Sequence, residues 1–124
     1  MESWGLIHFD YIRVVSALYT MENENRELLK EAAGLISSDL QTPISMQDWD
    51  EEALVRYLTP LVRGMLDRDF NRFLQICYRI DLGEKKLKTI LAEAPPETLA
   101  ETLARELVAR QVQKILLRRK YSGH

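Results

Sequence analysis

The chain of 124 residues is long enough for a single folded domain, spanning 1–124, with 46% hydrophobic and 29% charged residues and a net charge of −2. Five glycines and four prolines among many helix-forming residues exclude a disordered or fibrous protein and favour an all-α fold. The start, MESWGLIHFDYIRVV, fits neither a signal peptide nor a membrane-spanning helix, and the one cysteine excludes an intrachain disulfide. We therefore expect a cytoplasmic protein without membrane association.

The first predicted element is one long helix. Apolar residues recur in it at alternating steps of four and three, the spacing of a coiled coil, in which Asn25 would be the buried polar residue that sets the register. The stretch TMENENRE leaves a second interpretation open, in which a new helix begins near Asn23. We call the repeating positions the heptad seam: Ile7, Tyr11, Val14, Leu18, Met21, Asn25, Leu28, Ala32 and Leu35.

A loop is predicted over SSDLQTPISMQ, because serine, aspartate and proline interrupt the repeat. The next helix has a start signal in Asp50, whose carboxylate can accept backbone N–H bonds, or alternatively in Asp48. Pro60 lies on its path. The proline predicts either a kink or a second helix with Thr59 as its cap.

The stretch DRDFNRFLQICYRIDLGE predicts a core helix, since its apolar residues cover more than half of the circumference. Asp67 and Asp69 are both placed to cap its start, while Asp81 and Glu84 have the spacing of a capping box that begins the following helix. That short helix is predicted to end before Pro95. The overlapping segment YRIDLGEKKL resembles segments of small helical bacterial proteins of uncharacterised function, which implies a bacterial source but no activity.

The last predicted helix runs from about Pro96 to Lys120 and has two apolar faces. One contains Leu103 and Leu107, and the other contains Val112 and Ile115. Either the second face meets another copy of the chain, or the helix lies at the centre of its own domain.

Together these elements predict an all-α bundle of about five helices with long first and last helices. Residues 1 to 60 carry 11 acids against 4 bases, net −7, and residues 61 to 124 carry 8 acids against 13 bases, net +5. The two halves should therefore attract each other, within one chain or between two.

Motifs for catalysis, metal binding or cofactor binding do not occur in the sequence. It contains two histidines, His8 and His124, and one cysteine, Cys77, whose neighbours are apolar. We expect no metal and no cofactor, and we interpret Cys77 as a buried structural residue. Enzymatic activity is not expected, although paired carboxylates could still converge in the fold.

Two groups of cations are candidate binding sites. The first is an arginine ridge, a set of guanidinium groups suited to carboxylates or phosphates: Arg68, Arg72 and Arg79. The second is a basic patch in the last helix, the best signal for nucleic acid: Arg110, Lys114, Arg118, Arg119 and Lys120.

Three functions follow from these features. The leading hypothesis is a non-enzymatic interaction or scaffold protein that acts as a homodimer with an unknown protein partner, because the first and last helices carry more apolar surface than a small monomer needs. The second is a nucleic-acid-associated protein using the basic patch. The third is an anion-binding protein or small enzyme using the arginine ridge.

Overall fold

The described part of the chain folds into five helices. The structure, a computed structural model, describes the backbone of residues 2–45 and 49–122, and the side chains of these residues except 2–13, 19 and 20. Within this part of the chain there is no strand, so the predicted all-α fold with long first and last helices is confirmed. The helices are α1 (Glu2–Leu40), α2 (Glu51–Arg68), α3 (Phe70–Ile80), α4 (Glu84–Glu93) and α5 (Leu99–Ser122).

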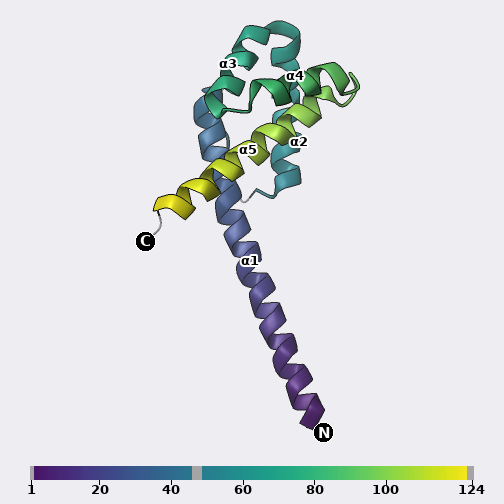
Figure 1. The fold of residues 1–124 in the computed structure, drawn as a ribbon, viewed down its shortest axis with the longest axis vertical. Helices are drawn as coiled ribbons and strands as arrows, with labels where there is room; N and C mark the ends of the chain where they lie inside the picture. The colour runs from purple at the N-terminus through teal and green to yellow at the C-terminus, as the bar shows by residue number, and fades with distance from the viewer. Residues whose placement is uncertain (1, 46–48, 123–124) are drawn as a thin grey trace.

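Helix α1 is continuous through TMENENRE, which confirms the interpretation as a single helix. It ends where Gln41 takes a left-handed conformation with a φ of 53°. There the amides of Gln41 and Thr42 donate to the carbonyls of Ser38 and Ser37, both at 3.2 Å. The N-terminal part of α1 projects well beyond the other four helices (Figure 1).

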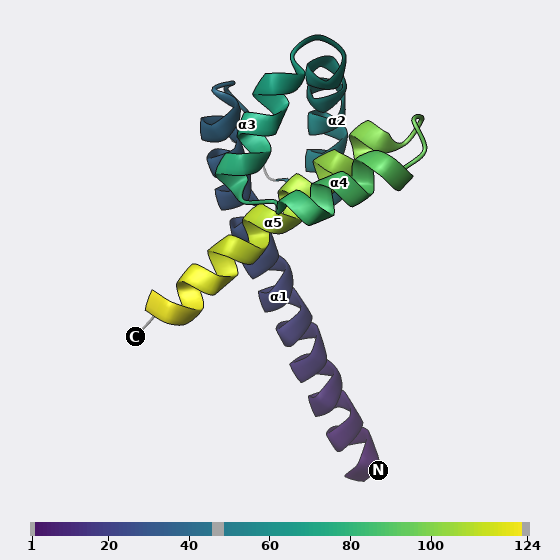
Figure 2. The same ribbon diagram turned by 45° about the horizontal axis from the view of Figure 1, so that its top comes forward.

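Helix α5 is the centre of the bundle and contacts each of the other four helices (Figures 1 and 2). Leu103 and Leu107 on one face and Val108 and Ile115 on the other are all buried within the chain. Of the two interpretations of its apolar faces, the central helix is therefore the one observed. Leu116, in contrast, is half exposed.

Local signals explain where α2 begins and why it is unbroken. The Ala53 amide donates to the Asp50 carboxylate at 2.7 Å, so Asp50 is the N-cap; the alternative cap, Asp48, lies outside the described residues. Pro60 lies inside the helix and neither ends it nor starts another. The Thr59 hydroxyl donates to the Val55 carbonyl at 2.7 Å instead of capping a new helix.

Helix α3 has one buried face and one exposed face. Its start is capped by Asp69, which accepts from the Arg72 amide at 3.3 Å. Phe73, Ile76, Cys77 and Ile80 are buried. The predicted core helix is therefore buried on one face only, because three of the apolar residues that covered more than half of its circumference are exposed: Phe70, Leu74 and Tyr78.

The turn between α3 and α4 also differs from the prediction. Asp81 does not cap α4; it takes a left-handed conformation with a φ of 62° at the end of α3, and Gly83 is the N-cap of α4. The capping box predicted from the spacing of Asp81 and Glu84 does not form, because Asp81 is needed to end α3. The Leu82 amide donates to the Cys77 carbonyl at 3.0 Å, which satisfies an acceptor in the last turn of α3.

Helix α5 holds α1 only at the C-terminal part of α1. Leu28 and Ala32 of the heptad seam pack with Ile115 in a small cluster, with Leu35 and Val112 at its edge. The heptad seam is therefore covered by the same chain from Leu28 onward.

Polar contacts reinforce the crossing of α1 and α5. The buried Gln111 amide donates to the Asp39 carboxylate at 2.8 Å, and the Arg119 guanidinium donates to Glu31 at 2.7 Å. Among the side chains that the structure describes, the Arg119 contact is one of two ion pairs that join the acidic and basic halves of the chain, as predicted. The other is bidentate, from Arg105 to Glu52 at 2.6 and 3.0 Å.

Candidate functional site

The three arginines of the arginine ridge do not share one helix. The backbone breaks at Asp69, so Arg68 lies in the last turn of α2, whereas Arg72 and Arg79 lie on α3. The Arg72 guanidinium donates to the Leu40 carbonyl and thereby caps the C-terminus of α1. Arg72 thus has a structural role that its spacing in the sequence did not indicate.

Two hollows flank Arg72. Arg68 and Arg72 line one of them, and Arg72 and Arg79 line the other, whose wall also contains Asp39 and Asp69. A carboxylate beside each guanidinium group lowers the positive potential that an anion would meet. The arginine ridge is thus divided between two hollows, and its central member is already bound to backbone.

Most of the basic patch is bound to acceptors of the same chain. Arg110 donates through Nε to the Asp81 carbonyl at 2.7 Å and through a second nitrogen to the Asp81 carboxylate at 3.1 Å. Lys114 reaches the Arg79 carbonyl at 3.5 Å, and Arg119 is paired with Glu31 as described above. These three cations are therefore already engaged in contacts within the chain.

The remaining two cations, Arg118 and Lys120, are exposed in the last turns of α5. Lys120 lies 5.8 Å from the centre of the Tyr121 ring, within the range of a cation–π contact. Two cations offer far less to a polyanion than the basic patch of five that the sequence suggested.

The electrostatic contacts of α5 extend to α2. The hydrogen bonds from Arg105 hold the pKa of the Glu52 carboxyl below its usual range, and they raise the pKa of the guanidinium. Because Glu52 is exposed and the pair joins two surface positions, this contact contributes modestly to stability.

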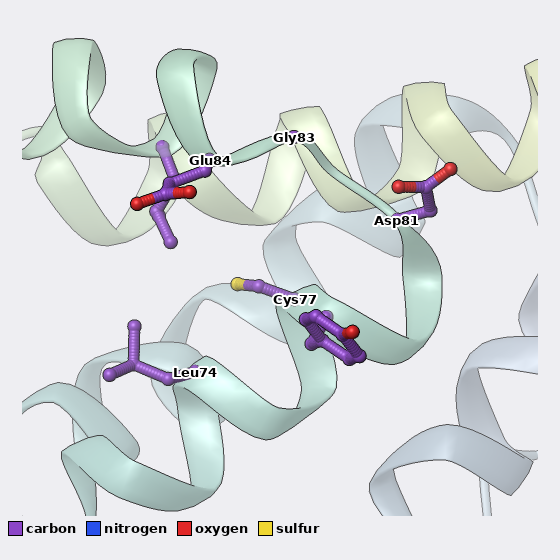
Figure 3. A pocket seen from close by; sticks show the side chains of 7 residues that line it. Leu74, Cys77, Asp81, Gly83 and Glu84 are labelled. Carbon is purple, nitrogen blue, oxygen red and sulfur yellow. The ribbon is translucent and has the colours of Figure 1, made fainter.

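A hollow of about 300 Å³ lies between α3 and the start of α4, and Figure 3 shows Cys77 with its sulfur pointing into it. Burial raises the pKa of the Cys77 thiol from 9.0 to about 12, so the sulfur is protonated at neutral pH and is a poor nucleophile. Leu74 and Glu84 flank the opening from the two helices (Figure 3). The surroundings of Cys77 agree with its interpretation as a structural residue.

The described side chains of the heptad seam before Leu28 are exposed to solvent. Figure 1 shows this part of α1 away from the other helices. We call its described members the projecting seam: Val14, Leu18, Met21 and Asn25, with exposed fractions of 55%, 58% and 63% for the three apolar side chains. The side chains of Ile7 and Tyr11, which continue the repeat, lie outside those described.

Charges beside the projecting seam are mostly acidic. Between Met21 and Leu28 the chain has three acids, Glu22, Glu24 and Glu27, and one base, Arg26, which pairs with Glu22 at 3.1 Å. Among the side chains that the structure describes, Glu24 and Glu27 form no ion pair, and Asn25 is exposed rather than buried. Within one chain, Asn25 therefore does not have the buried environment that its place in the repeat predicts.

Among residues 2–45 and 49–122, no group of three or more His, Cys, Asp and Glu side chains is placed to hold a metal ion. No helix in the same part of the chain combines the length and the apolarity needed to cross a membrane.

Comparison with known proteins finds no matching protein family, no matching curated protein and no matching solved structure.

Proposed function

We propose that the protein is a non-enzymatic interaction module that forms a homodimer through the projecting part of α1. The observation that supports this proposal is one apolar repeat with two environments: α5 covers it from Leu28 onward, and solvent meets it from Met21 back to Val14. Side chains at this spacing are those that a coiled coil buries between its helices.

The energetics of an isolated helix favour such a partner. A helix in water is marginal when no apolar face is packed, because backbone hydrogen bonds barely offset the lost conformational entropy. TMENENRE lowers this margin further, since asparagine has a modest helix propensity. A second helix on the projecting seam would bury Val14, Leu18 and Met21 and supply the missing stabilisation.

A second copy of the chain fits this surface well. A two-fold interface places the same patch of both subunits in contact, and a second projecting seam has the same spacing and the same length.

The test compares two variants that each add one carboxylate to α1. Leu18→Glu places it on the projecting seam, and Asn23→Glu places it on the opposite side of the helix. Sedimentation equilibrium at tens of micromolar should give a dimer for the wild type and for Asn23→Glu, and a monomer for Leu18→Glu. Circular dichroism and thermal unfolding would verify that the bundle of α2 to α5 is intact in both variants.

A wild type that stays monomeric at high micromolar concentration would remove the proposal. So would a Leu18→Glu variant that dimerises as tightly as the wild type, because the interface would then lie elsewhere.

A further inference from the structure

We infer that the two copies pair in antiparallel orientation, with the two-fold axis close to residue 16 of α1. This inference rests on the proposed homodimer and specifies which residues of the second copy occupy the projecting seam. Three observations support it: the position of α5 on the seam, the apolar residues that flank the seam, and the distribution of acids along α1.

The position of α5 limits how far a partner can extend. Ile115 already occupies the heptad seam at Leu28 and Ala32. In a parallel pair, the α5 helices of both copies would have to fit between the two α1 helices directly after Asn25. In an antiparallel pair, the partner's helix reaches its own N-terminus at that level, so the two uncovered segments match in length.

The register follows from matching these uncovered segments. With the axis near residue 16, Val14 lies opposite the partner's Leu18, Met21 opposite position 11, and Asn25 opposite position 7. A heptad repeat has two types of core position, a and d. In this register each layer contains an a residue of one helix and a d residue of the other, as antiparallel packing requires.

Residues beside the projecting seam agree with this axis. Val15 is 46% exposed although it is not part of the repeat, and Ala17 on the other side of the seam is exposed and small. In the antiparallel pair, Val15 lies against the partner's Val15 and Ala17 against the partner's Ala17, so apolar contact widens at the centre. In a parallel pair, Ala17 would instead face the partner's Glu22.

Charge also favours the antiparallel orientation. A parallel pair would bring Glu22, Glu24 and Glu27 of both copies to the same level, where like charges repel. The antiparallel register places this segment opposite positions 5–10, GLIHFD, which contain one acid. The acidic segments of the two copies then lie at opposite ends of the paired region.

Disulfide trapping in the full-length chain tests the orientation. Positions 7 and 25 are 18 residues apart, about 27 Å along a helix, which a disulfide cannot span. We expect an Ile7→Cys and Asn25→Cys mixture, combined under reducing conditions and then oxidised, to form a covalent heterodimer. Asn25→Cys alone should form none.

Two controls belong to this experiment. The wild type should not crosslink, because its one thiol, Cys77, is buried. A mixture of Ile7→Cys and Asn23→Cys should not crosslink either, because position 23 lies on the side of the helix away from the projecting seam.

The outcomes separate the inference from the proposal on which it rests. A covalent dimer of Asn25→Cys alone would show parallel pairing and overturn the inference while leaving the homodimer intact. Absence of crosslinks in a preparation that sediments as a dimer would also overturn it, because the register would be wrong. Absence of crosslinks in a preparation that sediments as a monomer would overturn both.

Discussion

The two parts of α1 carry the same apolar repeat in different surroundings. From Leu28 to Leu40 the helix is packed against α5, capped by Arg72 and joined to Gln111, whereas from Val14 to Met21 its apolar side chains meet solvent. The comparison teaches that a periodic pattern identifies the face a helix will bury but not the molecule that covers it. In α1, the chain's own α5 covers one segment of the seam, and the apolar side chains of the other segment are exposed.

The largest expected effect comes from removing the side chain that α5 places on the seam. Ile115 is 1% exposed, so Ile115→Ala should lower the free energy of unfolding by about 2–5 kcal/mol through lost burial and a new cavity. Denaturant unfolding at a concentration that keeps the protein monomeric would measure this loss. Leu18→Ala is the matched control in the projecting part of α1, and we expect a change within about 0.5 kcal/mol for it.

An equal decrease in the free energy of unfolding for Ile115→Ala and Leu18→Ala would contradict the difference between the two parts of α1. The projecting seam would then be packed within the monomer.

An intermediate effect is expected at the buried amide. Asp39→Ala leaves the Gln111 side chain, 2% exposed, without its acceptor, which should cost about 1–3 kcal/mol in the free energy of unfolding. Adding Gln111→Leu to Asp39→Ala removes the unpaired group and should restore part of that loss. A double variant as unstable as the single one would mean that the loss has another cause.

The smallest expected effect belongs to the ion pair between Arg119 and Glu31, since both side chains are about half exposed. A double-mutant cycle with Glu31→Gln and Arg119→Gln should give a coupling energy of no more than about 1 kcal/mol, decreasing with added salt because the pair is screened. A coupling that is unchanged at high salt would show that the pair is more shielded than its exposure indicates.

Local signals in the sequence were sufficient for most of the fold. The helices, their order and the caps at Asp50 and Asp69 follow from periodicity and from short-range hydrogen bonding, which residues close in the chain determine. Asp81 is the exception, because ending α3 required a left-handed residue at a position whose spacing indicated an N-cap.

Long-range contacts account for what the sequence did not predict. Arg72 binds the carbonyl of Leu40, which is 32 residues away in the sequence. Gln111 binds Asp39, which is 72 residues away. No short-range spacing in the sequence indicates either contact. One available signal was a polar Gln111 in line with Leu107 and Ile115, which indicates a buried amide in need of a partner. The candidate cations likewise could not be sorted from sequence, because their acceptors come from other helices.

The way α1 is held has a mechanical consequence. At about 1.5 Å per residue, the segment from Leu28 back to Glu2 is about 39 Å long, and it is held at one end, where α5 crosses it. Tilting the helix by about 5° at the crossing would therefore move its far end by about 3 Å. Substitutions at Asp39, Arg72 or Gln111, remote from the projecting seam, are expected to change the direction in which the projecting part of α1 points.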